Sequence, residues 1–351
     1  MQERIARSIV NKLRVRLASD SATIMHRRSK SAEAHDLVLR ARYLMRRDTR
    51  EGTLAAVSLL ERAEALDSTY AEVAAAQAEN YQTLAIFADQ SRIPGNRELR
   101  PGDAMQRAHH AAARAVRLDS LSASAHAALG AVAYRYDWDW ALAERELRRS
   151  IALNPTNATA YSVLARYLRS MGRFDEARRM LDRSVALSDD PAAALSYGRI
   201  SHVSRDFARA ERELRAMDHS LRAWRLWYAD ALGEIGRLVE ADSILAIPGD
   251  DPEDPEARLR RVVLLVRLGR VADARSQYSA AESRVREFPL LAAPALVALG
   301  DTGAAIAEVE RAVREHDPFV VDLAIDPRYD GLRSHPRFAS ILRALHFPSV
   351  P

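Results

Sequence analysis

The sequence predicts an all-α protein in which antiparallel helix pairs stack into a right-handed superhelical solenoid. Composition is the first reason: the 351 residues include 13 Gly and 14 Pro, aromatic residues make up 6% and apolar residues 48%. Such a chain favours helices over strands and has enough apolar residues for a large core. The second reason is a pattern that recurs about every 34 residues, in which a helix breaker or polar turn precedes an alanine and then a bulky apolar residue.

Eight alanines mark this recurring pattern along the chain. They are Ala56, Ala108, Ala143, Ala177, Ala210, Ala241, Ala274 and Ala305. The intervals between successive members are 52, 35, 34, 33, 31, 33 and 31 residues, so only the first departs strongly from the common period. A small side chain at each crossing lets the second helix of a pair approach its neighbour closely, which predicts stacked helix hairpins.

The first helix of each pair is expected upstream of its alanine. In 158–172, Tyr161, Leu164, Ala165 and Leu168 are spaced by three and four residues and share one helical face. Glycines at the ends of the first helices are expected to adopt the turn conformation that glycine tolerates best. These glycines are Gly172, Gly236, Gly269 and Gly300.

Some segments depart from the repeat. Residues 87–102 are rich in Pro, Gly and polar residues and are predicted to be a loop, as is the acidic run 250–256. The second helices near Met217 and Leu245 are expected to be short. The end of the chain is expected to cover the apolar edge of the last repeat, as terminal repeats must. The residues assigned to that cover are Phe319, Val321, Leu323, Leu332, Phe338, Leu342 and Leu345.

These residues resemble the tetratricopeptide repeat, over roughly residues 37–316 and in eight units. Three segments (34–67, 136–155 and 317–345) further resemble the repeat region that forms the C-terminal half of larger bacterial sensory proteins. Their N-terminal halves are winged-helix regulators, class III nucleotide cyclases or Ser/Thr kinases. The resemblance implies a regulatory scaffold that binds proteins. We divide the chain into a basic connecting helix (1–30), the repeat array (31–316) and a capping segment (317–351).

Motifs for catalysis are missing from the sequence. The chain has no cysteine, its lysines are Lys12 and Lys30, and no GxGxxG, Walker A, GxSxG or HExxH pattern occurs. We therefore predict no enzyme activity, no catalytic residues, no metal site and no cofactor. The adjacent pair His109–His110 points in directions about 100° apart on a helix, which does not suit one metal ion.

Two aromatic motifs allow a functional and a plainer interpretation. In YDWDW (136–140), the functional interpretation is either a carboxylate pair of Asp137 and Asp139 or an aromatic platform for a ligand. We favour a one-residue insertion at the turn, with one Asp capping the second helix. Trp224 and Trp227 lie three apart on a first helix, a spacing typical of core residues, although one could face a partner.

The concave groove formed by the first helices is the predicted ligand-binding surface. Positions one and four after the small buried residue of each first helix are expected to face it. In three consecutive units these positions, with one adjacent arginine, form a cationic row beside an aromatic contact: Tyr134, Arg135, Arg166, Arg169, Arg199 and His202. Guanidinium groups bind carboxylates through paired hydrogen bonds. The row predicts an acidic peptide or protein ligand, and the alternative is chance in an Arg-rich chain.

Two other functions compete with a protein-binding scaffold. The formal net charge is +4, and residues 1–50 alone carry +8, so a nucleic-acid or membrane-surface contact would have to use the basic N-terminal helix. We favour the interpretation in which the apolar face of this N-terminal helix packs on the first repeat, and we expect no nucleic-acid partner. The third possibility is an enzyme on a helical solenoid.

The sequence has no apolar run long enough to span a membrane and no signal peptide. We therefore expect a cytoplasmic protein, or an extracytoplasmic one if a longer membrane-anchored parent exists. The sequence leaves the oligomeric state open.

Overall fold

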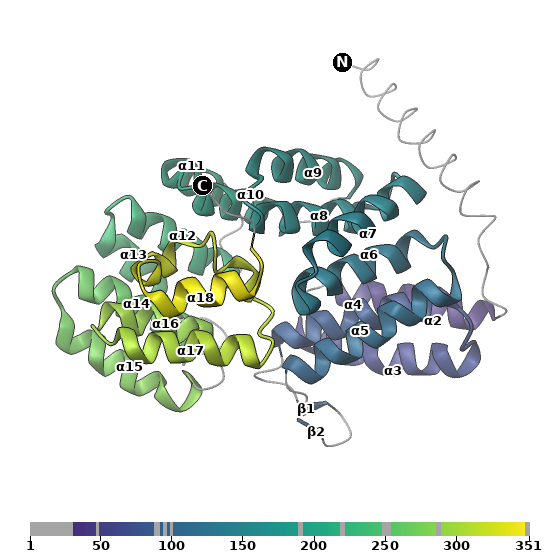
Figure 1. The fold of residues 1–351 in the computed structure, drawn as a ribbon, viewed down its shortest axis with the longest axis horizontal. Coiled ribbons are helices and arrows are strands. Elements are labelled where there is room, and N and C mark those ends of the chain that lie inside the picture. Colours follow the sequence, from purple (N-terminus) through teal and green to yellow (C-terminus); the bar gives the residue numbers. More distant parts are fainter. Residues whose placement is uncertain are drawn as a thin grey trace, which may run out of the picture. The chain divides into compact units, whose positions relative to one another are not determined.

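The computed structural model describes residues 31–46, 49–87, 92–93, 97–98, 101–188, 192–217, 222–247, 254–285 and 289–347 (Figure 1). The chain divides into two compact units. Unit 1 comprises Met1–Leu164 and Arg183–Ser188, and unit 2 comprises Ala165–Asp182 and Asp189–Pro351. The basic connecting helix predicted for residues 1–30 lies outside the described residues.

Unit 1 consists mainly of helix pairs. They are α2 (Ala32–Met45) with α3 (Arg50–Leu66), α4 (Ala71–Phe87) with α5 (Pro101–Leu118), and α6 (Ala123–Val132) with α7 (Trp140–Leu153). The first helices α2, α4 and α6 also pack on one another in succession. Between α4 and α5, where a loop is predicted, the two-residue strands β1 (Arg92–Ile93) and β2 (Arg97–Glu98) pair antiparallel.

Helices α8 (Ala158–Ser170) and α9 (Phe174–Leu187) run through the boundary between the units. The pairs of unit 2 are α10 (Ala192–Val203) with α11 (Phe207–Arg215), α12 (Arg222–Glu234) with α13 (Leu238–Leu245), α14 (Pro255–Arg267) with α15 (Val271–Val285), and α16 (Pro289–Ala298) with α17 (Thr302–Arg314). Two 3₁₀ helices and one α-helix follow: η3 (Val320–Asp322), η4 (Pro327–Leu332) and α18 (Pro336–Ala344). The predicted all-α fold is confirmed, and α11 and α13 are short as expected.

Close approach of helices explains the recurring small residues. All eight marker alanines have 0% exposed surface. The first helices use glycine in the same way: a Cβ atom on Gly130 of α6 would lie 2.7 Å from Cγ of Leu147, and one on Gly198 of α10 would lie 2.5 Å from Cγ of Leu214. A larger side chain at either position would push the two helices of a pair apart.

The turns after α8, α12, α14 and α16 confirm all four predicted glycine positions. Gly172, Gly236, Gly269 and Gly300 have φ between 72° and 89°. The turn between α10 and α11 has the same geometry, but Arg205 stands there with a φ of 66°. Its backbone N–H donates to the carbonyl of His202, and the N–H of Asp206 donates to that of Ser201, as in a glycine-ended helix. A non-glycine residue in this region is strained by about 1 kcal/mol.

The YDWDW motif is an insertion at a helix end. Residues 133–137 form the single π-helical turn η2, which accommodates one extra residue, and Trp138 follows with a φ of 53°. Asp139 caps α7 by accepting a hydrogen bond of 2.9 Å from the N–H of Leu142. The interpretation as an insertion with a capping Asp is confirmed.

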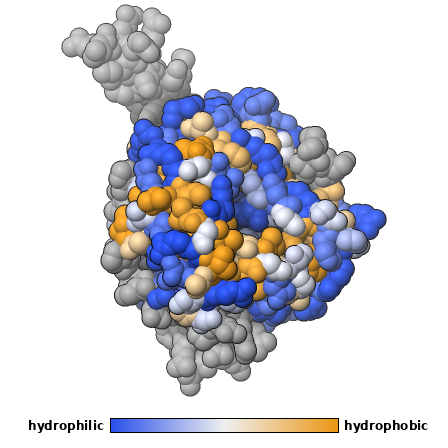
Figure 2. Space-filling model, turned by 90° about the vertical axis from the view of Figure 1, so that its left-hand side faces the viewer, coloured by the Kyte–Doolittle hydropathy of each residue, from blue (hydrophilic) through white to orange (hydrophobic). Residues whose placement is uncertain are grey.

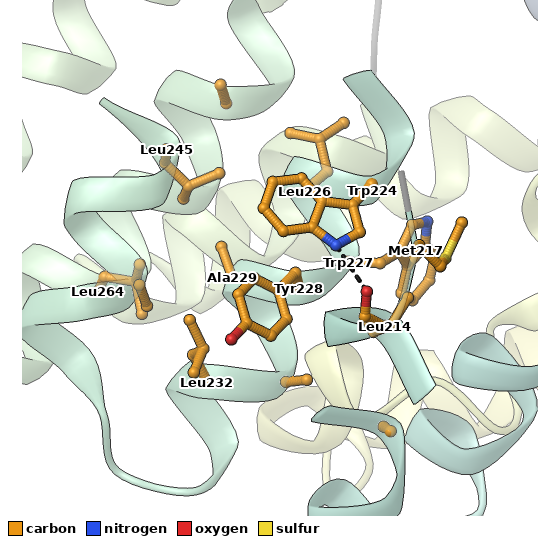
Figure 3. Packing of buried hydrophobic residues seen from close by; sticks show 14 residues of the cluster. Leu214, Met217, Trp224, Leu226, Trp227, Tyr228, Ala229, Leu232, Leu245 and Leu264 are labelled. Carbon is orange, nitrogen blue, oxygen red and sulfur yellow. Dashed lines mark hydrogen bonds between the residues drawn. The ribbon is translucent and has the colours of Figure 1, made fainter. Parts of the chain in front are cut away.

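A cluster of aromatic and aliphatic residues forms the core of unit 2 between α11 and α14 (Figure 3). Trp224 and Tyr228 stack with ring centroids 5.0 Å apart, and the indole N–H of Trp224 donates to the carbonyl of Leu214 at 2.7 Å. Trp224 and Trp227 are both buried, as the sequence indicates. This hydrogen bond satisfies the polar atom that burial of Trp224 removes from water.

The final residues contribute substantially to the core of unit 2. Of the residues assigned to the cover, Val321, Leu323, Leu332, Phe338 and Leu345 are buried. Leu342 is half-buried, and Phe319 is 43% exposed. Their burial gives the end of the chain a stabilising role, whichever repeats it covers.

Replacing Gly198 by Ala should lower the free energy of unfolding by about 1–3 kcal/mol, because the added methyl group overlaps Leu214. Gly303 is the matched control: a Cβ there meets only Oδ1 of Asp301, at 3.7 Å. Gly303→Ala should be neutral or slightly stabilising, since Ala is the better helix former. Urea unfolding followed by circular dichroism measures both, and equal effects would contradict the steric account.

Deleting residues 317–351 should lower the melting temperature and cause aggregation, because the deletion uncovers apolar surface. A finer pair of variants uses the same segment. Leu323→Ala should lower the free energy of unfolding by about 2–5 kcal/mol, because Leu323 is fully buried. Phe319→Ala should lower it by less than about 1 kcal/mol, because Phe319 is exposed. An unchanged melting temperature after the deletion would show that the segment does not stabilise the array.

Candidate functional site

Four of the six predicted site residues lie together in unit 2. Arg166 and Arg169 belong to α8, and Arg199 and His202 belong to α10. We call these four residues the arginine surface. Arg166 and Arg199 are half-buried, whereas Arg169 and His202 are only 3% and 1% exposed. The sequence predicts a row open to a ligand, but the chain's own residues 317–332, called here the C-terminal segment, cover part of it.

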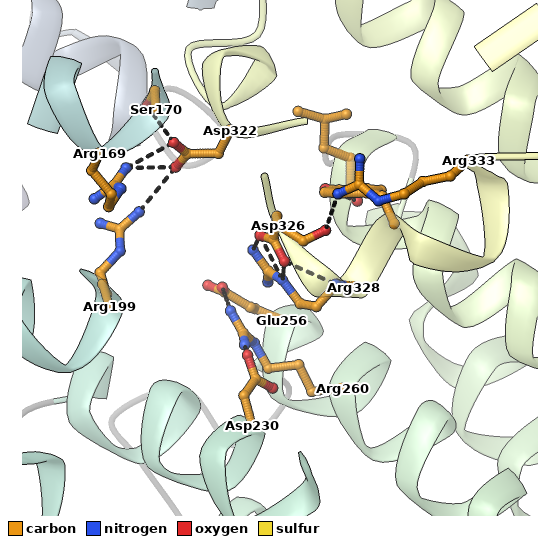
Figure 4. A network of polar contacts seen from close by, with 12 residues as sticks. Arg169, Ser170, Arg199, Asp230, Glu256, Arg260, Asp322, Asp326, Arg328 and Arg333 are labelled. Carbon is orange, nitrogen blue, oxygen red and sulfur yellow. Dashed lines mark hydrogen bonds and ion pairs between the residues drawn. The ribbon is translucent and has the colours of Figure 1, made fainter. Parts of the chain in front are cut away.

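Asp322 of the C-terminal segment is bound by this surface (Figure 4). Nη2 of Arg169 donates to both carboxylate oxygens of Asp322, at 2.8 and 2.7 Å. The hydroxyl of Ser170 donates to one of these oxygens at 2.6 Å, and Nη2 of Arg199 donates to the other at 3.3 Å. Three residues from two first helices therefore hold one carboxylate.

The electrostatics of Asp322 are those of a bound anion. Burial alone would raise the pKa of this carboxyl. The charges of Arg169 and Arg199, together with hydrogen bonds from Arg169 and Ser170, outweigh burial and hold the pKa of Asp322 below its ordinary value. Asp322 therefore stays ionised at neutral pH, and the positive charges of Arg169 and Arg199 compensate its negative charge.

The rest of the C-terminal segment lies along further first helices of unit 2. Arg205, at the strained turn after α10, binds Asp330 with two hydrogen bonds of 2.6 and 2.9 Å. The hydroxyl of Tyr329 donates to the carbonyl of Leu290 in α16 at 2.9 Å. A Cβ atom on Gly331 would lie 2.7 Å from Cγ1 of Val297, also in α16. Within unit 2 the segment thus contacts α8, α10, the turn after α10, and α16.

Trp227 of α12 is the aromatic centre of this region. Three guanidinium groups lie against its ring, with Cζ atoms 4.6 Å (Arg199), 5.0 Å (Arg328) and 5.2 Å (Arg260) from the centroid. Carboxylates balance two of these cations: Asp326 pairs with Arg328 at 2.6 Å, and Arg260 pairs with Asp230 and, at 2.8 Å, with Glu256. Cations on an indole face are attracted by its quadrupole, more strongly when desolvated, which favours this arrangement.

His202 lies beside the ring of Trp227, with centroids 5.6 Å apart in an edge-on arrangement. Both ring nitrogens are buried without a hydrogen-bond partner. Burial lowers the pKa of His202 to about 4, and Arg328, Arg260 and Arg199 act in the same direction, while Asp326 opposes them. His202 is therefore a neutral residue of the interior and no cation at neutral pH.

The remaining two predicted site residues belong to unit 1. Tyr134 lies in the π-helical turn and is 1% exposed, packed near Trp140 with ring centroids 6.4 Å apart. Arg135 is half-buried, and its guanidinium carbon lies 5.9 Å from the centre of the Tyr134 ring. The extra residue of the π turn changes which side chains of this helix end face inward, an effect that the regular spacing used for the prediction leaves out.

Sequence reasoning missed the residues that complete the site: Ser170, Arg205, Trp227, Asp322 and Asp330. A signal was present in the spacing of Asp322, Asp326 and Asp330, three carboxylates four residues apart between apolar residues. The apolar residues alone suggested a cap. Pairing the acids with cations on α8 and α10 requires the long-range fold.

A cavity of about 430 Å³ lies elsewhere in unit 2, where α9 and α11 begin. Arg178 and Arg209 line it, and both are bound by Glu213.

Among the described residues, no group of three or more His, Cys, Asp or Glu side chains is placed to hold a metal ion. Within the same part of the chain, no helix is long and apolar enough to cross a membrane. On the face in Figure 2, apolar and hydrophilic side chains are intermixed.

Residues 139–200 and 225–289 each match a family model described as tetratricopeptide repeat. The chain is similar to the APC/C hetero-tetramer Cut9–Hcn1, with 14% identity, 94% of this chain and 58% of that chain covered, and a TM-score of 0.54. It is also similar to a tetratricopeptide repeat protein from Parabacteroides merdae (14% identity, 77% and 99% covered, TM-score 0.49) and to yeast Tom70 (15%, 90% and 68%, TM-score 0.46). Among curated proteins, none matches this chain.

These matches, with the helix pairs and the buried alanines, define an all-α solenoid of tetratricopeptide repeats. Such repeats stack so that each contacts its neighbours, which exposes an extended surface formed by successive first helices. In unit 2 the arginine surface and the C-terminal segment occupy that surface.

Lowering the pH from 7 to 4.5 should destabilise the protein through His202. The unfolded chain protonates this residue near pH 6.5, but the folded chain does so only near pH 4, so stability is lost between these values. At pH 4.5, protonation of His202 in the unfolded chain lowers the free energy of unfolding by about 2–3 kcal/mol. Urea unfolding at both pH values should show this loss in the wild type and its absence in His202→Phe. Groups that do not interact with His202 titrate equally in both proteins, so identical pH dependences would refute the assignment.

Proposed function

We propose that this chain is a non-enzymatic tetratricopeptide-repeat scaffold that binds a protein or peptide through the arginine surface, by recognising carboxylates. The observation that supports this most directly is the capture of Asp322 by Arg169, Arg199 and Ser170. These side chains come from successive first helices, where a solenoid offers equivalent positions side by side. The partner is an acidic segment of another protein.

Geometry and charge both favour this ligand class. Arg169 already binds a carboxylate at hydrogen-bond distance, and Arg166 lies one helical turn earlier on the same face of α8. Fixed guanidinium groups pay less ordering entropy than flexible ammonium groups when they bind a carboxylate. Within unit 1, the half-buried Arg135, whose guanidinium group lies beside the ring of Tyr134, is a separate candidate contact for an acidic ligand. The resemblance to the repeat regions of bacterial sensory proteins supports a regulatory role in signalling or transcription.

Replacing Arg166 by Gln should weaken binding of an acidic peptide about fivefold, the equivalent of about 1 kcal/mol for a half-buried cation. The probe is a short fluorescein-labelled peptide that ends in consecutive aspartates, and fluorescence anisotropy measures its Kd. Binding of the wild type should be weak and should weaken further in high salt. Arg135→Gln tests the unit 1 residues in the same assay.

Arg212→Gln is the matched control, because Arg212 is an exposed arginine of α11, on a second helix. It should change the Kd less than twofold. Both variants should unfold at the same urea concentration as the wild type, within the effect of a surface substitution. Equal losses for Arg166→Gln and Arg212→Gln would show that the peptide responds to general positive charge.

A further inference from the structure

We propose that the C-terminal segment is a ligand mimic: the partner is an acidic and apolar segment built like residues 317–332, and this part of the chain occupies the inner surface of unit 2 until the partner displaces it. The inference rests on the proposed function, since it names the partner class and the regulation of the same surface. It rests on the contacts of Asp322, Asp330 and the apolar residues between them.

The C-terminal segment is bound as a ligand would be. It belongs to no repeat, and it is irregular apart from the short helices η3 and η4. Its charged contacts reach residues 123 to 153 positions earlier in the chain, through Asp322 and Asp330. An irregular segment whose side chains are held by successive first helices shows what the surface can accommodate.

The apolar residues of the segment set a second requirement on the partner. Val320, Leu323, Ile325 and Leu332 are buried in unit 2. A purely acidic tail could replace Asp322 and Asp330 but would leave this apolar surface exposed to water, which is unfavourable. The partner must therefore carry two carboxylates spaced eight residues apart, as Asp322 and Asp330 are, together with large aliphatic side chains.

Arg205 shows that the array itself is adapted to the segment. The equivalent turns after α8, α12, α14 and α16 have glycine, which adopts a positive φ without strain. Arg205 has a φ of 66°, and its guanidinium group forms the two hydrogen bonds to Asp330. A glycine at this turn would relieve the backbone strain but would lose the bound carboxylate.

Tethering explains how the segment controls binding. A short tether presents the segment at an effective concentration in the mM range. A free partner with the same contacts and an intrinsic Kd of about 1 μM would then bind roughly a thousandfold more weakly than to an open surface. Any change that loosens the segment without altering the first helices should therefore strengthen binding.

Two loosened variants of the full chain test this inference. Asp322→Asn removes the carboxylate bound by Arg169 and Arg199, and Gly331→Ala places a methyl group against Val297. The probe is a fluorescein-labelled peptide of residues 317–332. Both variants should bind it at least tenfold more tightly than the wild type in an anisotropy titration. The same peptide with Asp322→Asn should bind at least tenfold more weakly than the unaltered peptide.

Three measurements keep the result interpretable. Hydrogen exchange of residues 320–332 should be faster in both variants, which shows that the segment opens while the array stays folded. Gly303→Ala, which removes a glycine outside the site, should bind the peptide as the wild type does. Size-exclusion chromatography should show that the variants keep the wild-type size.

Other outcomes overturn the inference. If the segment opens in the variants but they bind the peptide no better than the wild type, the surface does not bind such a partner. If hydrogen exchange shows that the segment stays closed in both variants, the segment is a fixed part of the core. If size-exclusion chromatography shows dimers, the partner on this surface is a second copy of the chain. If the wild type binds the aspartate peptide through Arg166 while the loosened variants reject the segment peptide, the proposed function stands and this inference fails. If no chain binds either peptide, both fail.

Discussion

The close approach of helices at small residues is the constraint on which the rest of this structure depends. Eight fully buried alanines, together with Gly130 and Gly198, let the helices of each pair contact one another without an intervening large side chain. Each pair can then bury its apolar face only against the next pair, so the pairs stack. Stacking brings the first helices of unit 2 side by side, and equivalent positions on them become neighbours.

Neighbouring first helices turn a common residue type into a binding surface. Arginine is frequent throughout this chain, and several of its ion pairs among the described residues have both side chains exposed, where a pair contributes little. Arg169 and Arg199 differ because they are drawn from two helices onto one carboxylate in a region that excludes water. A buried charge without a partner is costly, so these arginines need an anion, and Asp322 supplies it within the chain. A cover that is both charged and apolar provides specificity as well as stability.

The region around Trp227 shows how such a surface tolerates so many cations. Three guanidinium groups lie on or near its ring, and His202 remains neutral beside them. Asp326, Asp230 and Glu256 balance Arg328 and Arg260, so the interior carries little net charge. The strained turn at Arg205 adds a further contact to the segment. A partner would have to reproduce this balance to replace the C-terminal segment.

The sequence by itself determined the repeat, the all-α class, the glycine turns, the cap at Asp139 and the burial of Trp224 and Trp227, because each depends on neighbours within about one repeat. It also indicated Arg166, Arg169, Arg199 and His202 as positions on the inner face. Only the tertiary structure decided that Arg169 and His202 are buried and that Asp322 fills the row, since these contacts join residues more than a hundred positions apart. The π turn likewise buried Tyr134, because one inserted residue rotates the side chains of a helix end by about 100°.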